Sequence, residues 1–346
     1  MSRPSTAFET ARHVVSAANA PGTYRVAGET ELLRLSLEEQ TVPPHLLDES
    51  LERAIASWVI ARGGRRLNLN ERQRSLAPAD LDRDPVVPVR RLISIAPSNA
   101  EIVGALGAAP LLVGVESSSD YPPEVLGLPR LGPDLAVDMA ALAALQPDLV
   151  LASLSVPGME RNIAGLDRLG LPLLVLAPQT LDDICGDVLR VGRALRMEAQ
   201  ARQVADAMRA TLARLDAQRR GQPPVPVYLE WWPKPMFTPG DRCWSNEMIA
   251  LAGGVNVFRD RVGQSVEVQP ADVAAADPQV IFLSWCGVPT DKLNPRRVAT
   301  RDGLQNVAAV RAGRVVPIDE SLLGRPGPRV IEGIARMAEV IRQARG

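Results

Sequence analysis

The chain has 346 residues, of which 39 are basic and 40 acidic; 46% are apolar and three are cysteines. This length and apolar content suffice for two domains with cores of their own and exclude a disordered chain. The net charge of −1 supplies no strong basic field, which argues against general binding to nucleic acid or to an anionic membrane surface. No apolar run reaches the roughly 18–20 residues of a transmembrane helix, so we expect no membrane insertion.

The start of the chain does not have the pattern of a secretory signal. Glu9, Arg12 and His13 interrupt any apolar core there. The three cysteines lie far downstream of a lipid-attachment position, and their wide spacing indicates no disulfide framework. The sequence as written therefore predicts a cytoplasmic protein, and a different start codon would make it periplasmic or otherwise extracytoplasmic.

Residues 1–88 differ in pattern from the rest of the chain. They hold both histidines, His13 and His45, and an amphipathic segment at Asp48–Ala61 that is followed by two glycines. The proline- and aspartate-rich stretch APADLDRDPVVPV then indicates a connector. We expect a small helical accessory region that ends near Pro88.

Strand and helix patterns alternate through residues 89–179. We expect strands at 91–96, 111–116, 148–153 and 171–177, and helices at 100–108, at 139–145 and after Glu160. Alternation at these lengths indicates βαβ units and a mostly parallel sheet. These residues form the expected first α/β lobe.

A connecting helical region is expected over residues 180–221. Thr180 and Asp183 have the spacing of a capping box. The segments Leu181–Arg196 and Glu198–Arg220 contain no proline, so they form two helices or one broken helix. The second would be about 35 Å long and could brace two lobes.

The strand and helix pattern restarts in residues 222–346, the expected second lobe. The sequences VDMAALAALQPDLVLAS and VQPADVAAADPQVIFLS share one pattern of short helix, turn, strand and serine, and AEIVGALGA corresponds to NEMIALAGG. We interpret them as pseudo-repeats. The predicted fold is thus an α/β protein with two Rossmann-like lobes joined by a long backbone helix, plus the helical N-terminal region.

Ligands of open α/β sheets bind at the carboxyl ends of the strands, so the residues that follow each strand are the candidates. In the first lobe these include Ser98, Asn99 and Tyr121. In the second lobe the same positions are rich in aromatic residues, namely Trp231, Trp232, Phe237, Trp244 and Trp285, with Cys286 beside them. The tryptophans either fill a small core at the loop ends or line a cleft between the lobes.

Catalytic and metal sites lack support in the sequence. Neither lobe contains a histidine, which excludes zinc or heme binding by histidine there. Cys286 therefore lacks a histidine base unless the accessory region supplies one. Ser98 and Ser153 lie in no GxSxG motif, and the chain has no Walker A or GxGxxG motif after a strand. We predict no catalytic residues and no bound metal.

Several motifs in order resemble a known family. RLISIAPSNAEIVGALGA, SDYPPEV, LAALQPDLVLAS, EWWPKPMFTPG with NEMIALAGG, and VAAVRAGRVVPID with RPGPRVIEGI are similar to the cobalamin-binding branch of the helical-backbone (class III) ABC-transporter substrate-binding proteins. The resemblance covers about residues 90–343. It implies two lobes joined by a long helix, a ligand between them and limited hinge motion.

The resemblance also implies roles for single residues. It places Tyr121 of the DYPP turn against the corrin ring, with Trp231, Trp232 and Phe237 in the facing loop and Trp285 and Cys286 in the next. Arg325 corresponds to a basic residue near the ligand, whereas Arg329 is interpreted as structural. Glu160 corresponds to the carboxylate that docks onto permease arginines. The matching carboxylate of the second lobe is missing, because Ala250 and Val255 occupy its candidate positions and Glu247 is a poor substitute.

The sequence therefore predicts a non-catalytic protein that binds cobalamin or a related corrinoid between its lobes, as the solute-binding component of uptake or as a cytosolic carrier. Its partners would be an ABC permease or a cytosolic protein that contacts residues 1–88. A ferric siderophore is an alternative ligand, which more arginines in the cleft would favour. An enzyme acting on a corrinoid or metal chelate is the other alternative, with His13 or His45 brought to the cleft.

Overall fold

The computed structural model describes residues 82–83, 85, 87–156 and 158–345, together with the backbone of three short strands near the N-terminus. The chain divides into two compact units, residues 1–77 and 78–346, so the division comes before the boundary expected near Pro88. Asp82 and Arg83 belong with the larger unit. Arg83 pairs antiparallel with Leu173, and Asp82 accepts a hydrogen bond from the backbone N–H of Val175.

The described residues of the N-terminal unit are strands: β1 (Gly22–Arg25), β2 (Leu32–Leu35) and β3 (Arg65–Arg66), in an antiparallel sheet of order β2-β1-β3. The accessory region is therefore not purely helical. The alternation of Leu33, Arg34, Leu35 and Ser36 has the period of two that a strand requires, a signal that the sequence analysis missed. The expected helix at Asp48–Ala61 lies outside the described residues.

The first lobe is the parallel sheet that the sequence predicted. Its strand order is β5-β4-β6-β7, and every pairing within it is parallel. Its elements are β4 (Leu92–Ser94), α5 (Pro97–Ala105), η3 (Ala109–Leu111), β5 (Leu112–Val115), η4 (Pro123–Gly127), α6 (Met139–Ala144), β6 (Leu149–Ser153), α7 (Glu160–Leu169) and β7 (Leu173–Leu176).

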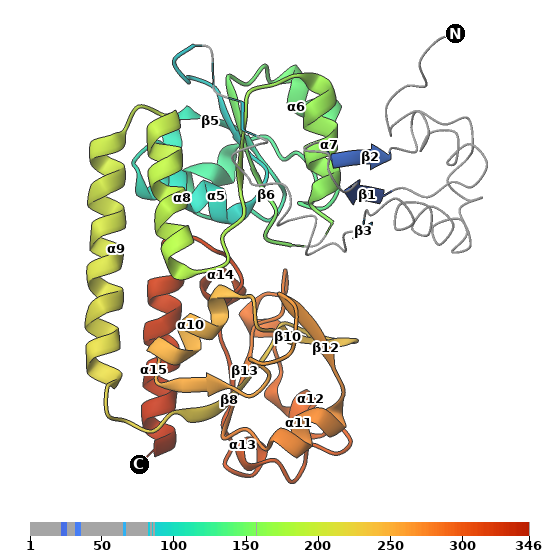
Figure 1. The fold of residues 1–346 in the computed structure, drawn as a ribbon, viewed down its shortest axis with the longest axis vertical. Coiled ribbons are helices and arrows are strands. Elements are labelled where there is room, and N and C mark those ends of the chain that lie inside the picture. Colours follow the sequence, from blue (N-terminus) through green and yellow to red (C-terminus); the bar gives the residue numbers. More distant parts are fainter. Residues whose placement is uncertain are drawn as a thin grey trace, which may run out of the picture. The chain divides into compact units, whose positions relative to one another are not determined.

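Two helices connect the lobes, α8 (Leu181–Ala194) and α9 (Glu198–Arg219). The predicted capping box is present at the start of α8, where Thr180 accepts from the backbone of Asp183 and the Asp183 carboxylate accepts from the backbone of Thr180. Helix α9 runs beside both lobes and leads into the second one (Figure 1). The backbone-helix prediction is confirmed.

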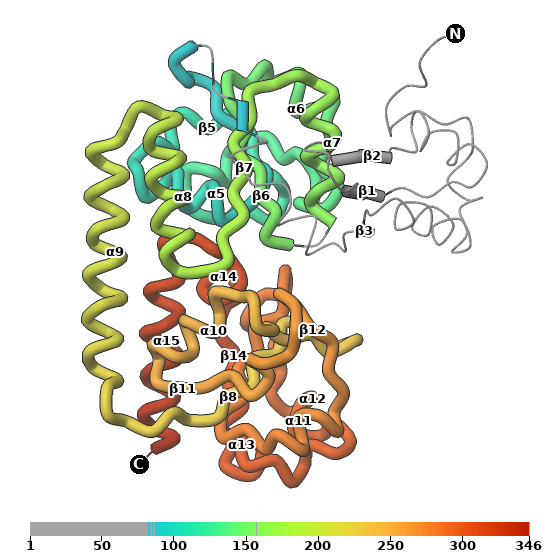
Figure 2. The backbone as a smooth tube through the Cα atoms, in the orientation of Figure 1, coloured from blue at the N-terminus to red at the C-terminus, as the bar shows by residue number. Residues whose placement is uncertain are grey.

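The second lobe has a parallel sheet of order β11-β8-β13-β14 and, in addition, an antiparallel sheet of order β12-β10-β9 that the sequence analysis did not expect. Figure 2 follows the chain through this lobe to the C-terminus. Its elements are β8 (Val225–Glu230), β9 (Trp232–Pro233), β10 (Met236–Pro239), α10 (Trp244–Leu251), β11 (Gly254–Asn256), β12 (Ser265–Val268), α11 (Pro270–Ala276), β13 (Val280–Leu283), η5 (Thr290–Lys292), α12 (Pro295–Ala299), α13 (Ala308–Arg311), β14 (Val315–Pro317), α14 (Glu320–Leu323) and α15 (Val330–Arg345).

One apolar core extends through both lobes. It includes Val103 of α5, Ile184 of α8, Ile249 of α10 and Ile334 of α15, all fully buried. Further buried clusters fill the remaining face of each sheet. Because a close-packed core resists deformation, this shared core favours small movements of one lobe against the other.

Candidate functional site

The carboxyl ends of the strands in the two lobes face each other, as two contacts show. After β6, the carbonyl of Ser155 accepts a 3.1 Å hydrogen bond from Nε2 of Gln264 in the second lobe. After β5, Asp120 accepts a 2.5 Å hydrogen bond from Arg325 of the second lobe. The loops at the strand ends therefore meet at the lobe junction, which is the candidate ligand site of this fold.

Exposed apolar side chains occur in the loops of both lobes. They include two aromatic rings, Tyr121 with 42% of its surface exposed, which follows Asp120, and Trp232 with 40%, which comes after the end of β8. The others considered are Val156, which follows Ser155, Val262, two residues before Gln264, and Leu135, which lies close to Gly158. Exposed apolar side chains in strand-end loops are typical of a ligand site. The sequence analysis found the two aromatic residues but missed the three aliphatic ones.

Tyr121 is held by the DYPP turn. The turn contains a cis peptide between Tyr121 and Pro122, and Pro122 lies so close to α5 that a Cβ atom at Gly104 would be 2.7 Å from its Cγ. The Arg329 guanidinium, which comes from the second lobe, lies 4.7 Å from the centre of the Tyr121 ring. One ring is thus fixed by a proline on its own lobe and by a cation–π contact from the other.

The tryptophans differ in their surroundings. Trp244 is 2% exposed and Trp231 is half-buried; their ring centres are 6.5 Å apart, and both pack in the core that the lobes share. Trp285 is also buried. Among these four tryptophans Trp232 is the exposed one, and its Nε1 donates to the carbonyl of Lys234. The small-core interpretation therefore fits Trp244 and Trp285, and the cleft interpretation fits Trp232. Phe237 pairs with Trp232 across β9 and β10 and is half-buried.

A buried polar network fixes the strand ends of the second lobe. Glu230, at the end of β8, accepts from Tyr228 Oη at 3.1 Å and from Trp285 Nε1 at 3.1 Å. Arg301 donates to both oxygens of the same carboxylate, at 2.6 and 3.1 Å. A carboxylate that receives four donors is well compensated for its burial, so this network orients Trp285 and its loop. No sequence motif points to Arg301.

Arg325 and Arg329 lie at the lobe junction. Arg325 is 7% exposed and contacts Asp120 and Glu101 of the first lobe and Glu320 of its own lobe. Arg329 also contacts Glu101, at 3.4 Å. Burial raises the pKa of Glu101 to about 7, although both arginines oppose the shift. Both arginines thus join the lobes, whereas the sequence analysis separated a ligand role for Arg325 from a structural role for Arg329.

Ser98 and Asn99 hold the start of α5 against the sheet. Both are buried. Nδ2 of Asn99 donates to the carbonyl of Ala152 at 3.0 Å, and the Ser98 hydroxyl lies 3.3 Å from the Asn99 side-chain oxygen. These hydrogen bonds remain within the first lobe, so the structure gives the two residues an internal role.

Cys286 is exposed, and its backbone N–H donates to the carbonyl of Trp231. Desolvation by the surrounding protein, together with the carboxylates of Glu320 and Asp134, raises the pKa of its thiol to about 12. The thiol is neutral at physiological pH and is a weak nucleophile. His13 and His45, the proposed bases, lie outside the described residues.

The two carboxylates considered for permease docking are both engaged locally. Glu160, at the start of α7, accepts from the backbone N–H of Gly158 at 2.8 Å. Glu247 of α10 accepts from the backbone N–H of Leu181 at 2.7 Å and thereby joins the second lobe to the start of α8. Glu160 remains a predicted docking residue, and Glu247 has an alternative role as a helix-terminal acceptor.

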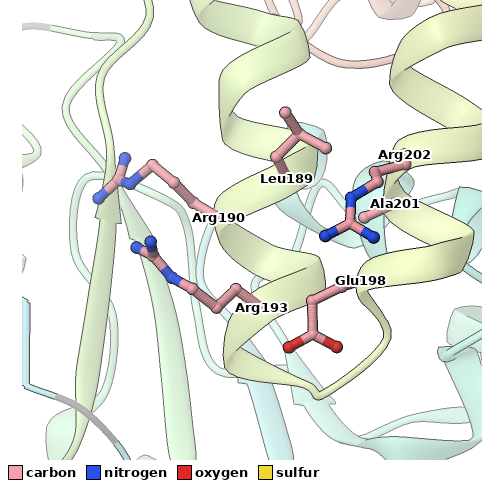
Figure 3. Close-up of a pocket in the computed structure, with 6 residues that line it drawn as sticks. All are labelled: Leu189, Arg190, Arg193, Glu198, Ala201 and Arg202. Carbon is pink, nitrogen blue, oxygen red and sulfur yellow. The ribbon is translucent and has the colours of Figure 1, made fainter.

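A pocket of about 270 Å³ lies between α8 and α9 (Figure 3). Its lining comes from these helices alone and comprises Leu189, Arg190, Arg193, Glu198, Ala201 and Arg202. Arg190 forms ion pairs with Asp82 and Asp187. This pocket is separate from the candidate site.

Within the described part of the chain, no three histidine, cysteine or acidic side chains are grouped as metal ligands. No helix within it has both the length and the apolar character needed to cross a bilayer.

The sequence profile of the periplasmic binding protein family matches residues 92–322, which span both lobes. The chain belongs to this family. The family match agrees with the resemblance given by the motifs, and its members are substrate-binding proteins.

Two relatives each match about three quarters of this chain. A vitamin B12-binding protein of Vibrio cholerae serotype O1 is 28% identical over 257 residues, 74% of this chain and 91% of the relative. An uncharacterized ABC transporter substrate-binding lipoprotein of Bacillus subtilis, YvrC, is 30% identical and covers 73% of this chain and 80% of its own length.

Two solved structures have the same fold. The periplasmic vitamin B12 binding protein BtuF of Vibrio cholerae has a TM-score of 0.65 and 28% identity, covering 75% of this chain and 98% of its own. The periplasmic heme-binding protein RhuT of Roseiflexus sp. RS-1 has a TM-score of 0.67 and 26% identity, covering 74% and 99%. The chain is thus a periplasmic binding protein with similarity to binders of two different macrocycles.

Proposed function

We propose that this periplasmic binding protein holds cobalamin or another corrinoid between its lobes and delivers it to an ABC permease. The observation that carries the proposal is one exposed aromatic ring in a strand-end loop of each lobe, Tyr121 beside the inter-lobe contact of Asp120 and Trp232 after the end of β8. Two such rings offer apolar faces to a flat macrocycle, and burial of that surface would provide the affinity. The similarity to vitamin B12-binding proteins supports this ligand.

The proposed role is binding without catalysis. Residues 78–346 contain no histidine, and the Cys286 thiol is held in its neutral form. The described residues therefore place neither a histidine base nor an activated thiol at the junction. The permease contact is proposed to include Glu160, and residues 1–88 are proposed to contact a further protein. Delivery to a permease implies action outside the cytoplasm, as the names of the relatives suggest for those proteins.

Heme is the second candidate ligand. It is favoured by the similarity to RhuT and by the exposed phenol of Tyr121, since tyrosine is a known ligand of heme iron. A ferric siderophore is less well supported, because the arginines that would bind such a chelate, Arg325 and Arg329, are already paired with carboxylates.

The proposal is tested by gel filtration of the protein mixed with hydroxocobalamin, followed at the corrin absorbance. We expect co-elution, and we expect Trp232→Ala to weaken it. Leu169→Ala is the matched control, because Leu169 is an exposed apolar residue at the other end of α7 from the junction. Capture of hemin or a ferric hydroxamate in place of the corrinoid would retain the binding site and replace the ligand.

A further inference from the structure

The strand β7 lies at the end of the first-lobe sheet, so one of its sides has no neighbouring strand of that sheet. Its four residues, LLVL, are all buried. The carbonyls of Pro172 and Leu176 accept hydrogen bonds from β6 and from the residue that follows it. Since backbone groups alternate in direction along a strand, those of Leu173 and Val175 point to the outer side. An apolar strand with such an edge is a template for pairing with another chain unless something covers it.

All four outward backbone groups of β7 have partners. Leu173 exchanges both of its hydrogen bonds with Arg83, at 3.0 Å from the Leu173 N–H and 2.7 Å to its carbonyl. The Val175 N–H donates to Oδ1 of Asp82 at 3.0 Å, and the Val175 carbonyl accepts from Nη2 of Arg190 at 2.9 Å. Asp82 and Arg83 thus take three of the four groups, and we call these two residues the edge cap.

Side-chain contacts hold the edge cap in place. Nε of Arg83 donates to the carbonyl of Leu171 at 2.9 Å, and its Nη1 forms a 2.6 Å ion pair with Asp167 of α7. The second carboxylate oxygen of Asp82 accepts from Arg190 of α8 at 2.8 Å. The edge cap therefore binds to β7, α7 and α8 at once, through its backbone and through both side chains.

The edge cap precedes residues 92–322, which match the family. It is thus a feature that this chain carries outside the matched lobes. We propose that the outer edge of β7 is a strand-docking surface, that the edge cap of the same chain occupies it, and that this occupancy prevents the β7 edges of two copies from pairing. With the cap detached, two copies could pair about a two-fold axis, each edge taking the place of the other's cap.

The test detaches the edge cap in the full-length protein. Asp82→Ala removes both carboxylate acceptors, and Arg83→Pro removes the N–H that donates to Leu173, so the double variant combines them. Val87→Pro is the matched control, because it adds a proline to the same connector at a residue that is 51% exposed. Amide hydrogen exchange of Leu173 and Val175 is measured over a range of protein concentration, with the molar mass from light scattering.

We expect the wild-type protein and the control to keep both amides protected and to have a mass that does not change with concentration. In the dilute double variant both amides should exchange roughly tenfold faster or more. As its concentration rises, the mass should approach that of a dimer and the protection should return, because the edge of a second copy takes up the same groups.

Unchanged exchange in the double variant would overturn the docking of the edge cap. Faster exchange without a dimer, or a dimer that leaves both amides unprotected, would overturn its role in preventing the pairing of two copies. Near-ultraviolet circular dichroism checks that the double variant is folded. If it is not, Asp82→Ala alone decides by the same criteria, with the exchange of Val175 and the mass as its readouts.

Discussion

Arg325 and Glu101 form an ion pair of 3.4 Å between the lobes, although 224 residues separate them in the chain. The second oxygen of Glu101 is buried without a hydrogen-bond partner. The glycine at position 327 packs over this carboxylate, since a Cβ atom there would lie 3.3 Å from the unpaired oxygen. A buried carboxylate with one unpaired oxygen is easier to protonate than an exposed one, which makes this contact sensitive to pH.

We expect the free energy of unfolding to fall as pH rises through about 7. Burial raises the pKa of Glu101 from 4.5 to about 7, and it raises the pKa of Asp187 to about 7 as well. The stability that these protons contribute is fully present below the unfolded pKa values and is lost as pH rises through the folded ones. Urea denaturation between about pH 5 and about pH 8 measures this fall. Glu101→Gln should reduce the fall, and the control Glu339→Gln should retain it; an equal fall in both would contradict the assignment to Glu101.

The order of strands and helices in residues 89–346 could be predicted because each element has its own local signal. Apolar periodicity marks β4 and β6, and the pair Thr180 and Asp183 marks the start of α8. The antiparallel sheet β12-β10-β9 could not be predicted in this way. Its strands have two to four residues each, and β10 pairs with β12 across the intervening α10 and β11.

The candidate site was only partly predictable. Trp231 and Trp232 are consecutive, and in extended chain successive side chains point to opposite faces, so only one of them could be exposed. The sequence has no signal for which one. Trp244 follows the same loop but begins α10, whose packing buries it. Gln264 and Arg301 act through partners 109 and 71 residues away, and local patterns carry no information on such contacts.

Truncation of Trp244 should destabilise the protein much more than truncation of Trp232. Trp244→Ala removes a fully packed ring from the core shared by the lobes, and we expect a loss of about 3–5 kcal/mol in the free energy of unfolding. Trp232→Ala removes an exposed ring, and we expect a loss of at most about 1 kcal/mol. Thermal denaturation compares the two. A large destabilisation by Trp232→Ala would show that its ring supports the fold and would remove it from the proposed site.

Gly192 sets the close approach of α8 and α9. A Cβ atom there would lie 2.2 Å from Cβ of Ala201, a distance that two carbon atoms cannot adopt. We expect Gly192→Ala to force the helices apart and to cost about 2 kcal/mol by overpacking. Ala201→Gly should restore much of this loss in the double variant, because it removes the opposing methyl group. If the double variant is no more stable than Gly192→Ala, the two positions are not in contact.

The pair of Glu230 and Arg301 should behave as a coupled buried ion pair. Arg301→Met leaves a fully buried carboxylate without its cation, and we expect a loss of about 3–5 kcal/mol. Glu230→Gln in the same background removes the unpaired charge, so the double variant should be more stable than Arg301→Met alone. Urea denaturation of the four proteins gives the coupling energy. Additive losses would show that the pair contributes no interaction of its own, and the orientation of Trp285 would then have to depend on its packing alone.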